Sequence, residues 1–150
     1  MSPGKARLRT ALQLQGIEKA RRSAAELALA EALAADREAQ GREAAAAAAL
    51  GNAEAEWARR LEAGPVDLEL QRLLAASLMA CEQALDARAG ERREAARRLD
   101  QCRTGWIDLE ASVRSGERYL KRWRREGSRH AAGRAEQALA DRTSWMWFRP

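Results

Sequence analysis

Residues 62–67 read Glu-Ala-Gly-Pro-Val-Asp, and this stretch decides how the 150-residue chain folds. Gly64 can end a helix in a left-handed conformation, and Pro65 directly after it cannot continue that helix. Asp67 can then cap a new helix, with Glu69 favourably placed in its first turn. The two other prolines lie at the ends of the sequence. The stretch therefore predicts one turn between two long helices.

The composition also favours helices over strands. Alanine takes 35 positions and leucine 18, whereas valine and isoleucine take two each. Because 33% of the residues are charged, the apolar residues can fill only a narrow seam, as in a coiled coil. We therefore expect an all-α fold, a long two-helix antiparallel coiled-coil hairpin in a single domain. Its parts are a helix at about 4–62, a turn at 63–67, a helix at about 68–140 and a C-terminal tail at 141–150.

The second helix carries the stronger pattern. Alternate steps of four and three residues from Leu74 give almost only apolar or small residues, and the repeat of 3.5 residues predicts a left-handed coiled coil. Only Arg88 and Arg92 are charged in this series. The series consists of Leu74, Leu78, Cys81, Leu85, Arg88, Arg92, Ala95, Leu99, Cys102, Trp106, Leu109, Val113, Gly116, Leu120 and Trp123.

The first helix has a less regular pattern, with leucine and tryptophan near its ends and alanine between them. An alanine seam lets two helices approach closely, although residues 44–49 also fit a low-complexity helix filler. Gly51-Asn52 is a candidate break in this helix. Glycines recur every eleven residues in the second helix, which indicates either a close neighbour or coincidence. The large residues near the ends of the first helix are Leu8, Leu12, Leu50, Trp57 and Leu61. Its seam alanines are Ala25, Ala28, Ala32, Ala35, Ala39, Ala46 and Ala53. The recurring glycines of the second helix are Gly105, Gly116 and Gly127.

Charge is distributed unevenly along the predicted hairpin. Residues 1–22 carry a net charge of +5 and residues 114–134 a net charge of +6, and these segments lie side by side if the chain folds back at Gly64. Residues 23–113 carry −6. A cluster of like charges is most simply tolerated when an acidic partner covers it, although a solvated basic face is the plain alternative. The predicted partner-binding residues are Lys5, Arg7, Arg9, Arg118, Lys121, Arg122, Trp123, Arg124 and Arg125.

The C-terminal residues form a second candidate binding segment. Trp145, Trp147 and Phe148 lie beyond the end of the pairing that the hairpin allows. Exposed aromatic side chains often mark interaction sites, so we favour docking to a partner protein. Two alternatives are a contact back onto the second helix and an anchor at a membrane surface.

The sequence lacks the residues of a catalytic, cofactor or metal site, so we expect no enzymatic activity. His130 has no ligand-like neighbours at metal-binding spacing, and Cys81 and Cys102 fall on the seam, where cysteine serves as a small apolar residue. At about 1.5 Å per residue along one helix, the two thiols are too far apart to form a disulfide. No run reaches the length of a membrane span and the start lacks a secretory signal, so we expect a cytoplasmic protein.

The whole pattern resembles the type III secretion stalk family, which comprises flagellar FliJ and the virulence-system YscO-like proteins. The similarity rests on the basic start with Leu8, Leu12 and Ile17, the turn at Gly64-Pro65, and the heptad helix that ends in the Arg-rich stretch 119–125. It implies a stalk that binds a hexameric secretion ATPase, the cytoplasmic domain of the export gate and secretion chaperones, peripherally at the inner membrane. The aromatic tail departs from that family's pattern.

The competing hypothesis is a nucleic-acid-binding or generic scaffolding hairpin, with nucleic acid as the less favoured partner. We expect a monomer, and self-association stays open because the unpaired end of the second helix can meet a second copy.

Overall fold

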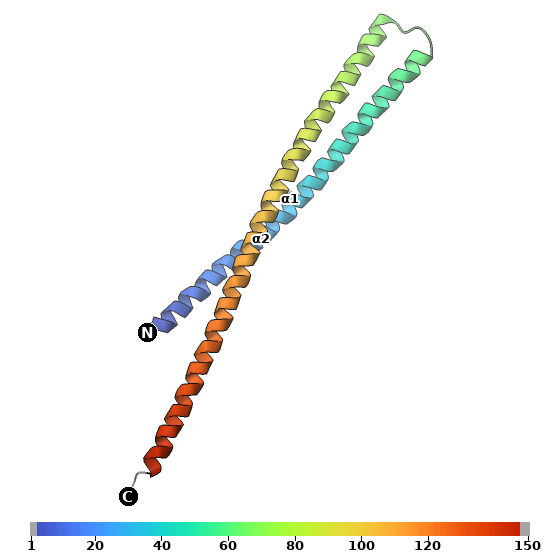
Figure 1. The fold of residues 1–150 in the computed structure, drawn as a ribbon. Helices are drawn as coiled ribbons and strands as arrows, with labels where there is room; N and C mark the ends of the chain where they lie inside the picture. The colour runs from blue at the N-terminus through green and yellow to red at the C-terminus, as the bar shows by residue number, and fades with distance from the viewer. Residues whose placement is uncertain (1–2, 148–150) are drawn as a thin grey trace. The chain divides into compact units, whose positions relative to one another are not determined.

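The computed structural model describes residues 3–147, and the side chains of residues 4–145. Helix α1 (Pro3–Glu62) and helix α2 (Leu68–Trp147) account for all of this range except the turn between them, and the described residues include no strand (Figure 1). The two helices pack against each other in opposite directions, since Gln15, early in α1, contacts Val113, whereas Glu43, later in α1, contacts Arg92, which comes earlier in α2. The predicted all-α antiparallel helical hairpin is confirmed.

The turn has the chemistry that the sequence predicts. Gly64 has a φ of +131°, a backbone conformation that a residue with a side chain rarely adopts. Asp67 caps α2: its Oδ1 accepts a hydrogen bond from the backbone N–H of Glu69 at 3.4 Å, and its carbonyl accepts one from Gln71 at 2.9 Å. The turn therefore ends one helix and starts the next with local contacts alone.

One expected helix boundary is wrong, and the candidate break in the first helix is absent. Helix α1 runs through Gly51-Asn52 without a break, because both residues are exposed and one glycine costs a long helix only about 1 kcal/mol. Helix α2 ends at Trp147 rather than at about residue 140. Residues 141–147 contain neither glycine nor proline, and the hydroxyls of Thr143 and Ser144 donate hydrogen bonds to carbonyls of the preceding turn at 2.9 Å.

The chain packs as two compact units, a division that the sequence did not predict. Unit 1 combines residues 1–23 with residues 107–150, and unit 2 comprises residues 24–106, including the turn. Each unit contains one segment of α1 and one segment of α2. Neither helix has, within the described residues, an apolar stretch long enough to cross a membrane.

The predicted seam of α2 is the packed face of that helix in both units. Every member of the series is buried or half-buried except Arg92, which extends to an ion pair with Glu43 of α1 at 2.8 Å. The most deeply buried apolar side chains are Ala39 and Leu99 in unit 2 and Val113 and Leu120 in unit 1. The 3.5-residue repeat therefore identified the core of this chain.

The seam of α1 also follows the heptad spacing, but polar residues occupy several of its positions. Ala28, Ala35, Leu12 and Leu61 are exposed, so their placement on the seam was wrong. Their places are taken by neighbours in heptad phase, including polar residues whose longer side chains reach across to α2. The seam residues of α1 are Leu8, Ala11, Gln15, Glu18, Arg22, Ala25, Leu29, Ala32, Asp36, Ala39, Glu43, Ala46, Leu50, Ala53 and Trp57.

Candidate protein-binding surface

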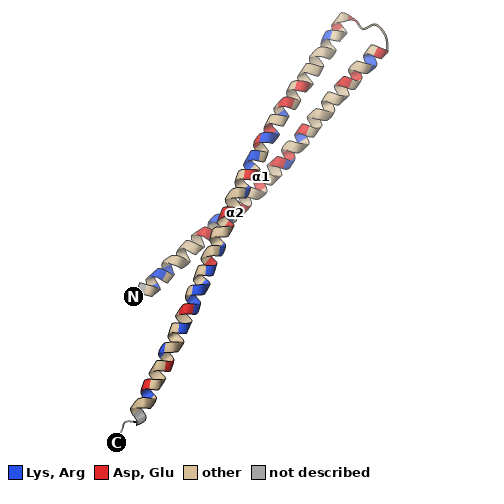
Figure 2. Ribbon diagram, in the orientation of Figure 1, with Lys and Arg blue, Asp and Glu red and all other residues tan. Residues whose placement is uncertain are grey.

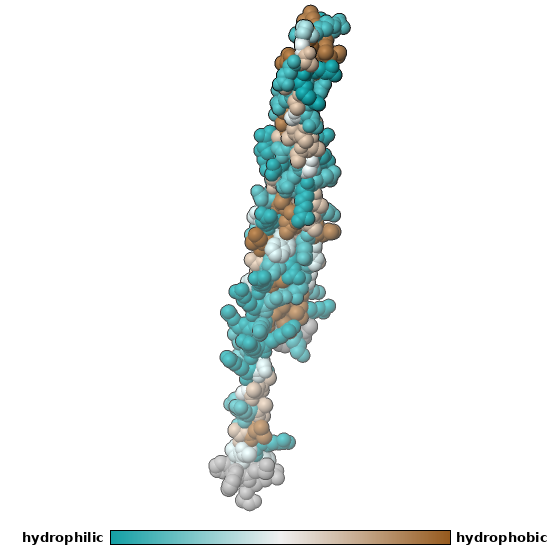
Figure 3. All heavy atoms as spheres, turned by 90° about the vertical axis from the view of Figure 1, so that its right-hand side faces the viewer, coloured by the Kyte–Doolittle hydropathy of each residue, from teal (hydrophilic) through white to brown (hydrophobic). Residues whose placement is uncertain are grey.

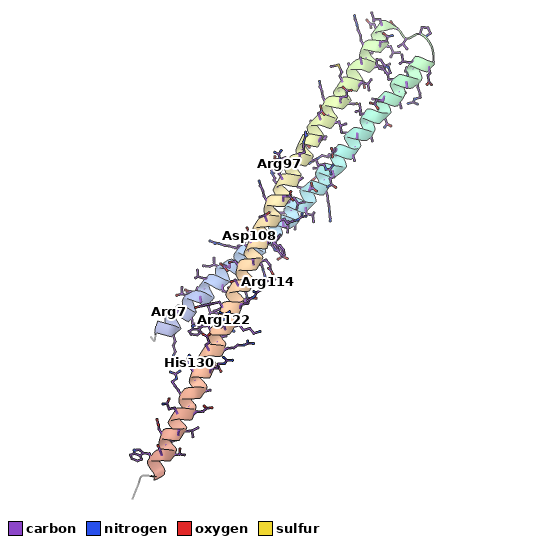
Figure 4. The ribbon with its side chains drawn as sticks, in the orientation of Figure 1. Arg7, Arg97, Asp108, Arg114, Arg122 and His130 are labelled. Carbon is purple, nitrogen blue, oxygen red and sulfur yellow. The ribbon has the colours of Figure 1, made fainter. Side chains whose placement is uncertain are left out.

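The cations predicted from the sequence gather on unit 1, where both helices contribute them (Figure 2). A Cβ on Gly4 would lie 3.9 Å from Cζ2 of Trp123, so the start of α1 lies against this part of α2. Figure 4 shows Arg7 and Arg122 on these two neighbouring segments. The eight predicted Lys and Arg side chains are all exposed. We name as the basic surface Lys5, Arg7, Arg9, Arg118, Lys121, Arg122, Arg124 and Arg125.

The basic surface is not neutralised by the chain itself. Within the described part of the chain, none of its side chains forms an ion pair. Other cations of unit 1 do find carboxylates, for example Lys19 with Glu117 at 2.8 Å and Arg114 with Glu110 at 2.8 Å. The positive charge of the basic surface is therefore available to an external acidic group.

The two units differ in net charge. Unit 1 holds sixteen Lys and Arg and seven Asp and Glu, a net charge of +9, whereas unit 2 holds eleven and fifteen, a net charge of −4. The modest overall charge of +5 conceals this separation. The field of unit 1 attracts acidic partners over roughly 10 Å in 0.1 M salt.

Beside the basic surface, polar contacts across the seam hold the two helical segments of unit 1 together. Gln15 is 7% exposed, and its Nε2 donates a hydrogen bond to the carbonyl of Val113 at 2.9 Å. Gly116 faces this side chain, and a Cβ at position 116 would overlap the amide of Gln15. By contrast, a Cβ added at Gly105 or Gly127 would meet nothing within 4 Å, so no close approach requires glycine at those two positions.

Two ion pairs and a hydrogen bond in the residues that follow Gln15 reinforce this arrangement. Lys19 pairs with Glu117, Arg22 pairs with Glu110 at 3.2 Å, and Ser112 donates a hydrogen bond to Glu18 at 2.8 Å. The hydrogen bond from Lys19 holds the pKa of the Glu117 carboxyl below its usual 4.5, and the charge of Lys19 lowers it further. Sequence reasoning missed these residues, although polar side chains at heptad positions of α1 were the available signal.

A groove runs along one side of this seam, between α1 and α2 of unit 1. Its volume is about 640 Å³. Its floor includes Leu12, which is 42% exposed, and the buried Leu120. Lys121, Arg124 and Arg125 of the basic surface stand at its rim. The other lining residues of this basic groove are Gln15, Gly16, Lys19 and Glu117.

The predicted aromatic binding residues do not share one environment. Trp123 is half-buried beside the start of α1, so it packs within unit 1. Trp145 is 67% exposed on the last turns of α2, together with the exposed Leu139. The side chain of Trp147 and the whole of Phe148 lie outside the described residues. The structure therefore brings Trp123, but not Trp145, to the basic surface.

The remaining chemistry-bearing residues form no cluster. Among the described residues, no group of three or more His, Cys, Asp and Glu side chains could hold a metal ion. Cys81 and Cys102 are free thiols, half-buried on the seam as expected. The indole N–H of Trp106 is buried and has no hydrogen-bond partner among the described residues. Unit 1 therefore remains the candidate site, as a surface for association.

The chain matches no protein-family model, and comparisons with curated proteins and with solved structures found no match either. The candidate site therefore has to be interpreted from its own residues: exposed cations on two helices that are fixed against each other by polar contacts.

Proposed function

We propose that this chain is a non-enzymatic central-stalk component of a bacterial type III secretion apparatus. In this role it binds a hexameric secretion ATPase through the basic surface, and it links the ATPase to the cytoplasmic domain of the export gate and to secretion chaperones. It acts in the cytoplasm, peripherally at the inner membrane. The proposal combines two lines of support. One is the resemblance of the sequence to the stalk family, and the other is the observed helical hairpin with its charges separated between the two units.

The observation that carries the proposal is the exposed basic surface on two antiparallel helical segments, whose cations form no ion pair within the described residues. A stalk in a ring of subunits must be thin, and a pair of helices is the thinnest packed structure that still buries a seam. Opposite charges across such a contact raise the association rate and select the correct partner. The polar contacts of Gln15, Lys19 and Arg22 support the proposal because they keep the cations of α1 and α2 in one surface.

Nucleic-acid binding is the second candidate, and one observation favours it. Tyr119 is 60% exposed one helical turn before Arg122 of the basic surface, so an aromatic ring for base stacking lies near a cation that can contact phosphates. The two candidates predict different dependences on salt. Phosphate contacts release counterions, so binding to nucleic acid falls by several orders of magnitude between about 50 and 200 mM salt.

The experiment measures ATP hydrolysis by a purified type III secretion ATPase from the same organism, with and without this protein. We expect stimulation that saturates at about one copy per hexamer. Arg118→Glu/Arg122→Glu/Arg125→Glu should abolish the stimulation, because it replaces three unpaired cations of the basic surface with acids. Circular dichroism at 222 nm checks that the variant stays helical.

The matched control reverses three exposed arginines of unit 2 that also form no ion pair within the described residues, Arg37, Arg72 and Arg93. This variant has the same net charge as the first and should stimulate the ATPase as the wild type does. Equal loss in both variants would show that only net charge matters and would remove the support for a specific surface. Absence of binding to the ATPase, together with salt-sensitive retention on DNA or RNA, would favour the second candidate.

A further inference from the structure

We propose that the basic groove of unit 1 binds the turn region of a second copy of this chain, so that copies associate head to tail. This inference goes beyond the proposed function and does not depend on it. It rests on two surfaces with complementary chemistry, one on each unit. The basic groove offers an apolar floor with a cationic rim, and the turn region offers exposed leucines between carboxylates.

The turn region of unit 2 exposes apolar side chains where the seam ends. Trp57 and Leu74 are the seam residues nearest the turn, and Val66 and Leu70 between them are also half-buried. In the same stretch, Leu61 is 52% exposed and Leu68 is 60% exposed. Figure 3 shows the apolar side chains that gather at this end of unit 2. Apolar patches of this kind on otherwise charged helices are typical of association surfaces.

Carboxylates accompany these leucines, and the chain leaves them without cations. Glu62, Asp67 and Glu69 are exposed, and none of the three forms an ion pair within the described residues. The arginines just before the turn are already engaged, since Arg59 and Arg60 both pair with Glu56 at 2.7 and 2.8 Å. The turn surface, defined as Leu61, Glu62, Asp67, Leu68 and Glu69, is therefore both apolar and acidic.

The basic groove is cationic where the turn surface is acidic, and it has room for a leucine side chain. Leu12 and Leu120 provide an apolar floor for a leucine side chain, and the groove volume of about 640 Å³ is within the usual range for binding pockets. Lys121, Arg124 and Arg125 of the rim have no carboxylate partner among the described residues, so each can pair with an acid of the turn surface. The contact removes unpaired charges of both signs and covers apolar area in one step.

The geometry of this association has a distinct consequence. Groove and turn are different surfaces of the same chain, so the contact is heterologous and leaves one free surface at each end of the assembly. The mass should therefore rise progressively with concentration instead of stopping at a dimer. A contact made by a few leucines and exposed ion pairs predicts weak binding, with a Kd on the order of 100 µM.

Sedimentation equilibrium on the purified full-length chain tests the proposal. In about 50 mM NaCl, we expect the weight-average mass to rise from 16.6 kDa at low micromolar concentration to at least about twice that value at 500 µM. In about 500 mM NaCl the mass should return to that of the monomer, because salt screens the exposed ion pairs. A mass of 16.6 kDa at every concentration in low salt would overturn the proposal.

Charge reversal identifies the two surfaces. Lys121→Glu/Arg125→Glu makes the groove acidic, Glu62→Lys/Glu69→Lys makes the turn surface basic, and each variant alone should stay monomeric. The chain with all four substitutions has an acidic groove and a basic turn, so it should recover the association of the wild type. Arg37→Glu/Arg93→Glu, which reverses two exposed arginines of unit 2, is the control and should associate normally.

Failure of the four-substitution chain to recover association, with helicity intact by circular dichroism, would overturn the assignment to these surfaces. A second outcome that contradicts the proposal is association of the wild type only after a polyanion such as heparin is added, since the groove would then bind an anionic polymer. No ATPase is present in these experiments, so their result is separate from that of the proposed function. Glu62→Lys/Glu69→Lys should also stimulate the ATPase as the wild type does, because it leaves the basic surface intact.

Discussion

In unit 2, the seam is filled mainly by leucine and cysteine from α2 against alanine from α1, whereas in unit 1 the α1 side of the seam is polar at three consecutive positions. Those positions are Gln15, Glu18 and Arg22. Both units use the same heptad geometry. They differ in how many directed polar contacts accompany the apolar burial, since Arg92–Glu43 and Arg42–Glu91 are the only ion pairs between the helices of unit 2 among the described residues.

This difference assigns separate tasks to the two units. Apolar burial is insensitive to pH and is not screened by salt, so unit 2 can hold the hairpin together under most conditions. Exposed ion pairs contribute little to stability and weaken in salt, so the contacts in unit 1 fix the orientation of the helices more than they add stability. The unit with the larger net charge, +9 against −4, is thus also the unit whose contacts between the helices depend more on salt and pH.

The largest effect on stability should come from the apolar seam of unit 2. Leu99 is 9% exposed, and Leu99→Ala removes buried methyl groups and leaves a cavity between the helices. We expect a loss of about 2–3 kcal/mol in the free energy of unfolding. Urea denaturation followed by circular dichroism at 222 nm measures this loss.

The matched control for this substitution is Leu73→Ala in the same unit. Leu73 is 68% exposed, so the same change removes little buried area and should alter the free energy of unfolding by less than about 0.5 kcal/mol. Similar losses for the two variants would contradict the view that the seam of α2 provides the stability of unit 2.

A smaller effect should come from the close approach of Gly116 and Gln15 in unit 1. Replacement of a helical glycine by alanine normally stabilises by about 1 kcal/mol, and we expect this for Gly16→Ala, because a Cβ there meets nothing within 4 Å. Gly116→Ala should lose that gain. Its Cβ displaces the amide of Gln15 and breaks the hydrogen bond to Val113, which is worth about 1 kcal/mol.

A double-mutant cycle isolates this contact. In the background of Gln15→Ala, the obstacle to a Cβ is gone, so Gly116→Ala should stabilise as much as Gly16→Ala does. Additive effects of the two substitutions in urea denaturation would mean that Gln15 and Gly116 do not meet in solution.

Most of the fold followed from the sequence, because it depends on local and periodic signals. The turn at Gly64-Pro65 and the cap at Asp67 are local chemistry, and the α2 seam is a repeat of large apolar residues that is hard to produce by chance. The extension of α2 to Trp147 was missed because an exposed aromatic segment was taken as the end of the helix. Nothing in those residues breaks a helix.

The candidate site was predictable only in part. The cations of the basic surface were identified because charge can be counted along a chain that folds back once. Gln15 was missed because a glutamine breaks an apolar pattern, and its value depends on a glycine about a hundred residues later. The basic groove and the turn surface depend on which leucines the packing leaves exposed, and periodicity alone does not determine that.

The smallest effect, and the one that separates the units by their chemistry, concerns the Lys19–Glu117 pair at 2.8 Å. Because Lys19 lowers the pKa of Glu117 from 4.5 in the folded state, the pair stabilises the fold above about pH 4.5, and this contribution is lost as the pH falls through the lowered pKa. Glu117→Gln should therefore lower the thermal midpoint slightly at pH 7, and the difference from the wild type should vanish at the acidic end of a titration from pH 7 to 3.

In the background of Lys19→Met the same substitution should have no pH-dependent effect, since the donor is gone. The loss caused by Leu99→Ala should stay constant down to about pH 4.5, because it involves no titrating group. If Glu117→Gln gave an equally constant difference, charge would not hold unit 1 together, and the contrast between the units would reduce to the volumes of their seam residues.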